Sequence, residues 1–598
     1  MSTVFKGIYF EGRQILKPGA YGVVKADSFV PNRPGPQNTI GILGTAMGGV
    51  PKVVTTINDP VTARTMLRGG NMLSCIELMY DPSPELPGAG EIKLYRLNAA
   101  VRATLALKDA GASTVLTVSA EDYGVWTNQL RLKVEAGSVS GKKITINDVL
   151  NQDVFEIGDN LGHAMTVSYV GIKFAAQLVI TKTGDAATQL QVQTKVTGAG
   201  DPWVTEATLD LTSDSLNALG EVVAFLDGLA DYTASIVGAA TLPSSELDAV
   251  AGQDIKTAPY TSSANIGAIV HWVNTQSLLA TASRQAGAAN VPANIAYTFL
   301  SGGSEGAAVT NTDWQIAIDA FLTENIHYLF VATSDATVHA MALDHCVFAS
   351  DLKQRKERRC FLGGAANETV EQTVTRAQAL ADKRAQLVYP GIKRRNLVTG
   401  NVDTLSPMFS AAAACGMKAG GRPEISLTFK NIRASGLEKT LTLTEIERLL
   451  DRGVTPLESV QEDGVFRIVQ DLTTYLVDAN VIWRKGFGVD IADYLNGQVR
   501  NAVSRFVGKV GDRSTVTSIL NAANDRLKQE VRSAKNQNGV LTDGTTDTGG
   551  IEPAYKNLQA VFDGFDLVAI TYEAHPVGEV AYITITASLT PTKIALSQ

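Results

Sequence analysis

Residues 328–352 read YLFVATSDATVHAMALDHCVFASDL, and this stretch decides the fold class. The short apolar run Tyr328 to Ala332 predicts a buried strand, and Ala336 to Leu352 predicts a helix directly after it. A buried strand that leads straight into a helix is typical of α/β proteins, in which helices cover both faces of a sheet. This part of the chain therefore predicts an α/β body.

The same pattern occurs near the start of the chain. Thr39 to Leu43 predicts an apolar strand, and Val61 to Tyr80 predicts a helix. Asp59 is the expected N-cap of that helix, with Pro60 at its first position. Ile92 to Leu97 predicts the next strand. Two separate stretches of the chain thus have α/β character.

The stretch between them differs in character. Residues 103–297 predict short alternating strands separated by Gly, Asn and Asp turns, with an amphipathic helix near residues 217–229. We interpret them as one or two inserted, mostly β domains. The expected fold class is a mixed α/β (α+β) multidomain protein, with a discontinuous α/β core formed by residues 23–102 and 298–578.

Several further elements are expected in the second half of the core. A strand at Tyr297 to Leu300 precedes a helix that Thr312 and Asp313 cap and that runs through Phe321. Helical spacing recurs at residues 374–387, and Ala411 to Ala414 form a small-residue helix patch suited to tight helix packing. A strand is expected at residues 425–429, an extended stretch at 465–476, and a long helix from about Ile491.

The two ends of the chain are expected to be extended arms, at residues 1–22 and 579–598. Residues 579–589 alternate between apolar and polar side chains, as a strand does, and an extended run at residues 4–10 precedes a turn at Pro18 and Gly19. A strand at a chain end can pair with the sheet of a neighbouring molecule. The residues expected to form such arms are Val4, Phe5, Ile8, Tyr9, Phe10, Ile583, Ile585, Leu589, Ile594 and Leu596.

Length and composition exclude several classes of protein. A chain of 598 residues is too long for one core, and 45% hydrophobic with 19% charged residues is ordinary for a globular protein. No apolar run reaches the length of a membrane span, and the N-terminus resembles no signal peptide. The four cysteines (Cys75, Cys346, Cys360 and Cys415) lack pairing motifs, which indicates a reducing cytoplasm. A net charge of −8 argues against nucleic-acid binding.

Two patterns could indicate chemistry, and both favour a structural interpretation. Gly302 to Gly306 matches Gly-x-Ser-x-Gly, but the helix expected after the serine begins only near Asn311, so we interpret the motif as a turn. His339 and His345, near Cys346 and Cys360, are six residues apart and lie on different sides of a helix, unlike metal ligands. Walker A, His-Glu-x-x-His and Gly-x-Gly-x-x-Gly motifs are missing from the sequence. We therefore expect no enzyme, no cofactor and no metal.

Charged residues in two segments are candidate contacts. The basic run contains Lys353, Arg355, Lys356, Arg358 and Arg359. It is interpreted either as a solvated helix end, where cations are favourable, or as a contact with another subunit or an acidic partner. In the helix from Ile491 the apolar stripe is buried, which leaves Asp493, Arg500 and Arg505 as further candidates.

Several short motifs, taken in their order along the chain, resemble those of the sheath proteins of contractile phage tails and related contractile injection systems. Residues 120–128 are similar to the family's Gly-x-Trp-Gly-Asn segment, although Thr127 replaces its usual Gly. Residues 299–306 are similar to Leu-x-Gly-Gly-x-Asp/Glu-Gly, and Pro18 to Tyr21 to the opening Pro-Gly-Val-Tyr. The remaining landmarks are Pro390-Gly391 and residues 405–407, 412–416, 426–428, 449–454, 467–474 and 506–508.

The resemblance implies a structural protein that assembles with copies of itself. Sheath subunits stack as hexameric rings around a tail tube, their arms add strands to neighbouring subunits, and a helix of the C-terminal body faces the tube. Contraction then drives the tube through the host envelope for genome ejection. The implied partners are the tail tube, baseplate and tail terminator proteins, and the implied location is the virion, assembled in the bacterial cytoplasm. The alternatives are a virion decoration or adhesin-like protein and the sheath of a non-phage injection system.

Overall fold

A computed structural model describes residues 8–10, 13–15, 39–149, 154–395, 400–460, 464–478, 481–546 and 548–583. The chain divides into two units, residues 1–36 and 37–598. In the first unit, β1 (Ile8–Phe10) pairs antiparallel with β2 (Arg13–Ile15). The expected arm residues Ile8, Tyr9 and Phe10 are therefore in a strand, while Val4 and Phe5 lie outside the described residues.

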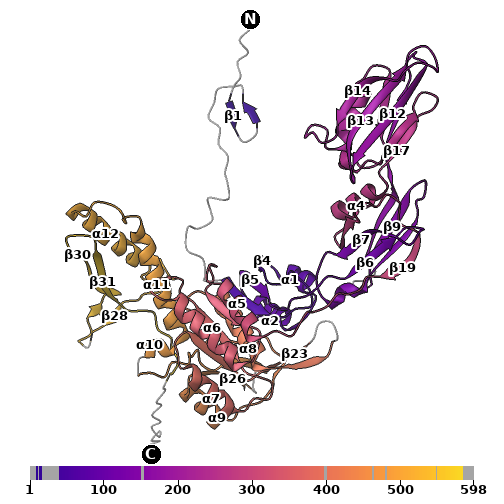
Figure 1. Cartoon of the computed structure of the whole chain (residues 1–598). Coiled ribbons are helices and arrows are strands. Elements are labelled where there is room, and N and C mark those ends of the chain that lie inside the picture. The colour runs from indigo at the N-terminus through magenta and orange to yellow at the C-terminus, as the bar shows by residue number, and fades with distance from the viewer. Residues whose placement is uncertain are drawn as a thin grey trace, which may run out of the picture. The chain divides into compact units, whose positions relative to one another are not determined.

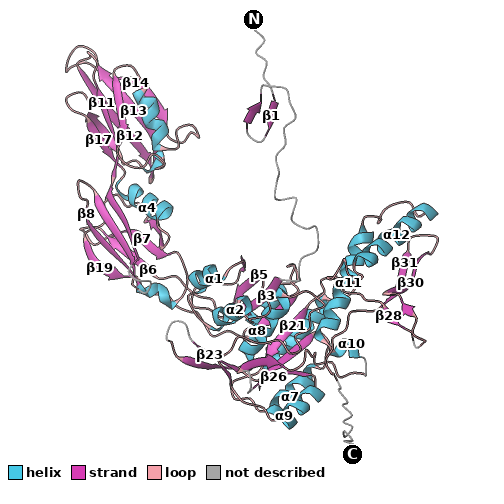
Figure 2. Cartoon of the chain, turned by 180° about the vertical axis from the view of Figure 1, so that it is seen from behind, coloured by secondary structure: helices cyan, strands magenta, loops and turns pink. Residues whose placement is uncertain are grey.

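The core of the second unit is an eight-stranded sheet in the order β27-β26-β22-β21-β20-β3-β5-β4 (Figures 1 and 2). Its six inner strands are parallel, and an antiparallel strand lies at each edge. The strands are β3 (Thr39–Gly44), β4 (Val54–Ile57), β5 (Glu91–Arg96), β20 (Tyr328–Val331), β21 (Arg359–Gly363), β22 (Ala385–Tyr389), β26 (Val454–Val460) and β27 (Val465–Ile468).

The core is discontinuous in sequence, as predicted. Strand β3 pairs in parallel with β20, with Ile40 opposite Tyr328 and Leu43 opposite Val331. These two strands come from before and after the long insertion. The mixed α/β fold class predicted from the sequence is confirmed.

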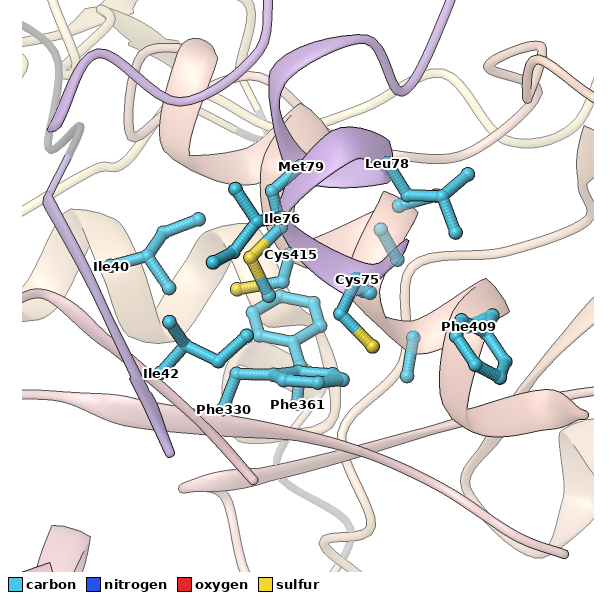
Figure 3. Close-up of a cluster of buried hydrophobic side chains, with 14 of the residues drawn as sticks. Ile40, Ile42, Cys75, Ile76, Leu78, Met79, Phe330, Phe361, Phe409 and Cys415 are labelled. Carbon is cyan, nitrogen blue, oxygen red and sulfur yellow. The ribbon is translucent and has the colours of Figure 1, made fainter. Parts of the chain in front are cut away.

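Helices cover both faces of this sheet because its buried strands are apolar on both sides. Ile40, Ile42 and Phe330 point into one hydrophobic cluster, part of which Figure 3 shows, and Leu43 and Leu329 point into the other. The first cluster includes α1 (Pro60–Leu67), α2 (Asn71–Tyr80) and α8 (Pro407–Gly420). The second includes α5 (Asn311–Ala320), α6 (Ala336–Ala349), α7 (Val370–Leu380) and α9 (Leu443–Asp451).

Local capping explains where several of these helices begin. The carboxylate of Asp59 accepts hydrogen bonds from the N–H groups of Val61 and Thr62 at 2.9 and 2.8 Å, and Pro60 is the first helical residue, as predicted. Helix α5 is capped by Thr310, in a capping box with Asp313, rather than by Thr312. Thr369 and Thr442 cap α7 and α9 in the same way.

The insertion contains two domains, each with its own hydrophobic core. One domain, called the outer domain, is inserted within the sequence of the other, called the inner domain. The inner domain has its own buried cluster and a helix. Its elements are β6 (Thr104–Lys108), β7 (Thr114–Ala120), η2 (Val125–Gln129), β8 (Leu130–Ala136), β9 (Lys142–Asp148), β10 (Val154–Leu161), α4 (Asn265–Gln276), β18 (Ala280–Arg284) and β19 (Ile295–Phe299).

The outer domain lies between β10 and α4 in the chain and has a separate buried cluster. The chain enters it after Gly162 and leaves at Ala264, whose N–H donates to the Gly162 carbonyl at 2.8 Å. Its elements are β11 (His163–Tyr169), β12 (Ala175–Thr183), β13 (Ala186–Lys195), β14 (Val204–Asp210), α3 (Leu219–Asp227), β15 (Tyr232–Ile236), η3 (Ser244–Glu246), β16 (Val250–Asp254) and β17 (Tyr260–Ser263).

The C-terminal part adds a further small core. Its elements are α10 (Val481–Arg484), α11 (Gly486–Ser504), α12 (Arg513–Gln529), β28 (Gly544–Thr545), β29 (Ile551–Glu552), β30 (Tyr555–Phe562) and β31 (Val568–Ala574). A separate three-stranded sheet is formed by strands that come between β22 and β26 in the chain. They are β23 (Ile392–Arg395), β24 (Val402–Leu405) and β25 (Gly436–Leu437).

Two expected helices are shorter than predicted. The helix expected over residues 61–80 is broken because Arg68 adopts a left-handed backbone conformation (φ 61°) and two glycines follow. The helical pattern at residues 374–387 ends at Leu380, and its last residues belong to strand β22. A buried helix and a buried strand give similar short apolar runs, which explains the error.

The strand predicted at residues 425–429 was wrong. Residues 425–427 have no regular structure, residues 428–429 form a turn, and Phe429 has a φ of 55°. The Phe429 N–H still donates to the Ile468 carbonyl of β27 at 2.8 Å, but side chains satisfy much of the remaining backbone. The ammonium of Lys418 donates to the carbonyls of Pro423 and Ile425, and Asp471 accepts from the Leu427 N–H at 3.3 Å.

Four other boundaries also differ from expectation. The extended stretch at 465–476 is a strand only over β27, and the long helix begins at Gly486, five residues before Ile491. The strand expected at Tyr297 to Leu300 is β19, which pairs with β8 of the inner domain rather than with the core. Residues 579–583 are not in a strand, and Ile585, Leu589, Ile594 and Leu596 lie outside the described residues.

Candidate assembly surfaces

Strands β30 and β31 form a two-stranded sheet of their own. They pair antiparallel, from Tyr555 opposite Ala574 to Phe562 opposite Val568. The turn between them is set by Asp563, whose carboxylate accepts from the N–H groups of three of the four following residues at 2.8–3.1 Å. A side chain that satisfies the turn in this way fixes the strand register.

One face of this hairpin packs against helix α12. Tyr555, Leu558 and Ile570 contact a cluster that includes Ala523 and Leu527, and the Tyr555 hydroxyl donates to the Asn524 side-chain oxygen at 2.7 Å. A hairpin alone is only marginally stable, so this helix is what holds it in shape.

Both outer edges of the hairpin are open. Within the described ranges, neither β30 nor β31 pairs with a third strand. Each edge therefore presents backbone N–H and C=O groups that another strand could pair with.

The chain is fixed again after the hairpin, at Glu579. Its carboxylate pairs with the Lys485 ammonium and accepts from the Ser426 hydroxyl. Burial alone would raise the pKa of Glu579, but the hydrogen bonds from Lys485, Ser426 and Thr428 outweigh it and lower that pKa. The segment that follows Glu579 thus leaves the body from a defined point next to the start of α11.

A mainly apolar pocket of about 670 Å³ lies at this exit point. Its walls come from the ends of α9, α10 and α11 and from residues 576–582. Val481 and Tyr582, on opposite segments of the wall, are 65% and 81% exposed. Exposed apolar side chains therefore border the point where the C-terminal segment leaves the body. Within the described residues, no other apolar group covers them.

The predicted basic run is divided by the fold. Helix α6 ends at Ala349, so the run is not a helix end but the loop into β21. Lys353 and Arg355 are exposed, and Lys356 donates to the Leu322 carbonyl at 2.7 Å. Arg358 and Arg359 are each only 1% exposed.

The buried Arg358 acts inside the subunit. It donates to the carbonyls of Phe321 and Glu324 at 2.9 and 3.0 Å and contacts the His345 ring at 3.0 Å. Burial lowers the pKa of the Arg358 guanidinium. Three backbone and ring partners explain why this cation is tolerated in the interior.

Candidate residues from the basic run and from helix α11 meet one another. Arg359 binds both carboxylate oxygens of Asp490, at 2.7 and 2.9 Å, and Arg500 binds both oxygens of Glu357, at 2.7 and 2.8 Å. Asp493 pairs with Arg384. These pairs fasten α11 to the core sheet, so Arg359, Asp493 and Arg500 are engaged within the chain, whereas Arg505 at the end of α11 is exposed.

Sequence reasoning missed the anchoring residues Asp490, Glu357, Arg384 and Lys418. Lys418 is fully buried and lies 3.1 Å from Asp490. A signal was present: Asp490 lies in the largely apolar stretch of residues 486–491, and a charge that is buried there requires a partner of opposite sign. Burial would raise the pKa of Asp490, but Arg359 and Lys418 outweigh it and lower that pKa.

The histidines are structural. His339 and His345 are buried, and this burial lowers their pKa values to about 4 and about 3, with Arg358 lowering that of His345 further. His339 contacts the Thr333 carbonyl at 2.9 Å. In the part of the chain that the structure describes, no group of three His, Cys, Asp or Glu residues could hold a metal ion, and no helix is long and apolar enough to cross a bilayer.

The Gly-x-Ser-x-Gly match lies in the irregular segment that joins β19 of the inner domain to α5 of the core, and not in a regular turn. Ser304 forms a bridge with Val101, and α5 begins only at Asn311. Glu305 pairs with the fully buried Arg96 at 2.7 Å and accepts from the Val125 N–H. The motif therefore serves an ionic junction rather than a nucleophile.

Comparisons with known proteins give one consistent answer. Residues 307–474 match the phage tail sheath protein central domain. The chain is 30% identical to the tail sheath protein of Bacillus phage SP01 over 592 residues, which cover 98% of this chain and 97% of the relative. It is 24% identical to a putative tail sheath protein of Enterococcus phage phiEF24C over 588 residues, 96% of this chain and 97% of the relative.

The fold is similar to that of a solved sheath protein. A sheath tail protein from Listeria innocua superposes with a TM-score of 0.50 at 15% identity, covering 90% of this chain and 96% of that protein. At this level of identity the likeness concerns the fold alone.

Proposed function

The chain belongs to the family of phage tail sheath proteins, and from this we propose that it polymerises into hexameric rings stacked around a tail tube. Contraction of this lattice would drive the tube through the host envelope for genome ejection. The extended lattice would be metastable, and the contracted one would bury more surface, so that no chemical fuel is needed.

The β30–β31 hairpin is the observation that carries this proposal. It has two open edges, and the chain has two expected strand arms, at residues 1–22 and 579–598. We propose that each hairpin receives one N-terminal and one C-terminal arm from neighbouring subunits. Each added strand contributes several backbone hydrogen bonds, each worth about 0.5–1.5 kcal/mol net.

The lengths of the arms suit this exchange. An extended chain spans at most about 3.3–3.6 Å per residue. The segment after Glu579 can therefore bridge at most roughly 65 Å, and the segment before Thr39 roughly 130 Å. Both distances exceed the diameter of a single small domain, so an arm can reach a hairpin on another subunit while its own end stays anchored.

Contact with the tube is proposed for the exposed cations only. Lys353, Arg355 and Arg505 are free to face an acidic tube surface, and Arg500 connects their two segments through the Arg355 carbonyl at 3.4 Å. Exposed charge pairs are weak and screened by salt, which suits a contact that must release during contraction. Baseplate and tail terminator proteins are the further proposed partners, and the virion, assembled in the bacterial cytoplasm, the proposed location.

Two other candidate functions are less well supported. A virion decoration protein is the less favoured hypothesis, because the similarity to the tail sheath protein of the Bacillus phage extends over the insertion as well. A particle without a genome would use the same subunit, but the similar proteins named above belong to phages, which favours a virion.

Removal of the arms tests the exchange directly. We expect the full chain to form hollow cylinders of uniform width in negative-stain electron microscopy. Variants that lack residues 1–22 or residues 584–598 should remain folded monomers, because Glu579 and the hairpin are retained in both. Circular dichroism and sedimentation measure the fold and the size of each variant.

A variant that lacks both arms gives the decisive control. Cylinders formed by this variant would refute strand exchange as the basis of assembly. A full chain that formed neither cylinders alone nor rings on added tail tube would refute the sheath function itself.

A further inference from the structure

The outer domain carries a solvent-facing sheet surface whose central side chains are uncharged. Strands β14-β13-β12-β16 form this sheet, which is seen among the outer-domain strands in Figure 1. Leu178, Ile180, Leu190 and Val192 are buried and face the domain core. Because side chains alternate along a strand, the residues between them point to the opposite face.

The outward side chains lie in rows across the sheet. Gln193 is opposite both Gln177 and Thr205, and Gln191 is opposite both Val179 and Thr208. These central rows contain amides, hydroxyls and one valine but no charged group. The carboxylates at the margins, Asp210 and Asp254, are engaged in turns with Thr212, Lys256 and Thr257.

A hydrogen-bond network holds these amides in place. Gln177 donates to the Gln193 side-chain oxygen at 2.7 Å, and Gln193 donates to that of Gln191 at 3.0 Å. Gln191 and Gln193 also donate to the hydroxyls of Thr208 and Thr205, both at 3.3 Å. Ordering a free glutamine side chain costs conformational entropy, so a network that is already ordered lowers the cost of binding a ligand.

An aromatic ring stands at one end of the same surface. Trp203 directly precedes β14, is 39% exposed, and lies beside Lys195, whose ammonium is 5.1 Å from the ring centre. Lys195 belongs to the outward set of β13 and donates to the Ala199 carbonyl. The ring, the valine and the amides therefore share one continuous face.

We propose that this face of the outer domain binds a neutral polysaccharide. Each amide still has unused donor and acceptor capacity, and each threonine hydroxyl can both donate and accept, which matches the hydroxyl groups of a sugar. The flat apolar ring of Trp203 and the side chain of Val179 match the C–H faces of pyranose rings. Because the central rows carry no charged group, an ionic ligand fits this face less well than a neutral one.

Other occupants fit this surface less well. A purely solvated face would be expected to carry both signs of charge, as protein surfaces usually do. A nucleic acid or an acidic glycan would need cations, and the one lysine here is held by a backbone carbonyl. The inference concerns a domain separate from the arms and the hairpin, so it does not depend on the proposed assembly.

Affinity electrophoresis of the full chain tests the proposal. Native gels would contain dextran, hydroxyethyl cellulose or galactomannan, with carboxymethyl cellulose as the charged comparison. We expect retardation by at least one of the three neutral polymers, in proportion to its concentration. Trp203→Ala should weaken that binding about tenfold, and Gln193→Glu, which places a carboxylate in the network, should weaken it similarly.

Matched variants separate binding from general damage. Phe225 is a 43% exposed aromatic on helix α3 of the same domain, and Gln276 is an exposed amide at the end of α4. Phe225→Ala and Gln276→Glu should bind as the parent does, and circular dichroism should show that all four variants are folded. The proposal is overturned if none of the three neutral polymers retards the parent, or if Trp203→Ala and Phe225→Ala bind equally. It is also overturned if Trp203→Ala changes only self-association in sedimentation, which would make this face a contact between subunits.

Discussion

Arg359 and Asp490 face each other with almost no exposure to solvent. The Lys418 ammonium contacts the second oxygen of the Asp490 carboxylate. At the scale of single residues, these charges are fixed by burial and by direct contact with one another. A buried pair contributes little net stability, but the loss of one partner leaves the other charge without compensation. Helix α11 is therefore attached at a point where substitution is costly.

Asp490→Asn should be strongly destabilising. It leaves two buried cations, Arg359 and Lys418, without a counter-charge, and such losses cost about 3–5 kcal/mol. Urea unfolding followed by circular dichroism measures the change. The control Arg448→Met removes an exposed cation that pairs with Glu371 and should change stability little. Equal effects of the two substitutions would contradict the buried-pair argument.

Acid should destabilise the fold through its buried histidines. The pKa of His339 is lowered from about 6.5 to about 4 by burial, so as the pH falls the unfolded state binds a proton before the folded state does. Stability should therefore decrease between pH 7.5 and pH 5, with a contribution from His339 on the order of 2 kcal/mol. Urea unfolding midpoints measured across this pH range should change less in His339→Gln than in the parent. The same dependence of the midpoint on pH in both proteins would show that His339 does not cause the loss of stability.

At the scale of elements, α2 and α8 pack closely against each other through small residues. Ala411 to Ala414 are fully buried, as expected for a small-residue helix patch used in packing, and Cys415 lies beside them in the cluster of Figure 3. A side chain added at Gly416 would place its Cβ 2.5 Å from the Met79 carbonyl oxygen. The two helix backbones therefore approach through this glycine.

Two glycine substitutions should have opposite effects. Gly416→Ala forces apart the backbones of α8 and α2 and should destabilise the protein by about 1–3 kcal/mol. Gly497→Ala, in α11, meets no atom closer than 4.0 Å and should stabilise it by about 0.5–1 kcal/mol through helix propensity. Thermal unfolding of both variants beside the parent would show the difference in sign, and a shared sign would refute the close-contact explanation.

Elements with a local cause could be predicted from the sequence, and those that depend on distant partners could not. The cap at Asp59 and the strand at Thr39 follow from neighbouring residues. The irregular path of residues 425–429 depends on Lys418, Ile468 and Asp471, whose positions only the fold determines. For the same reason the basic run was expected on the surface, although Arg358 and Arg359 are buried by elements far away in the sequence.

At the scale of the whole second unit, the chain is built as domains within domains. The α/β core is interrupted by the inner domain, and the inner domain is interrupted by the outer one, each with its own buried cluster. The chain enters and leaves the outer domain at Gly162 and Ala264, which are joined by a backbone hydrogen bond, and side chains such as Glu246 and Arg284, 3.4 Å apart, also meet across this base. Independent cores with adjacent ends can be removed without breaking the rest.

Excision of the outer domain should leave a working subunit. A variant in which a short Gly-Ser link replaces residues 163–263 should fold, because the cluster of the inner domain contains no residue from that range. If the arms carry the linkage between subunits, the variant should still form cylinders in electron microscopy. Insoluble or unfolded protein would show that the two cores are not independent, and folded monomers would implicate the outer domain in assembly.

The paired backbones at Gly162 and Ala264 also have a genetic consequence. A gene exchange that keeps this narrow base intact can replace everything beyond it in one event, since no side chain of the inner cluster is altered. The outer domain can then diverge while the core sheet and the arms of the chain stay unchanged. The same base offers an attachment point at which a foreign domain could replace the outer one.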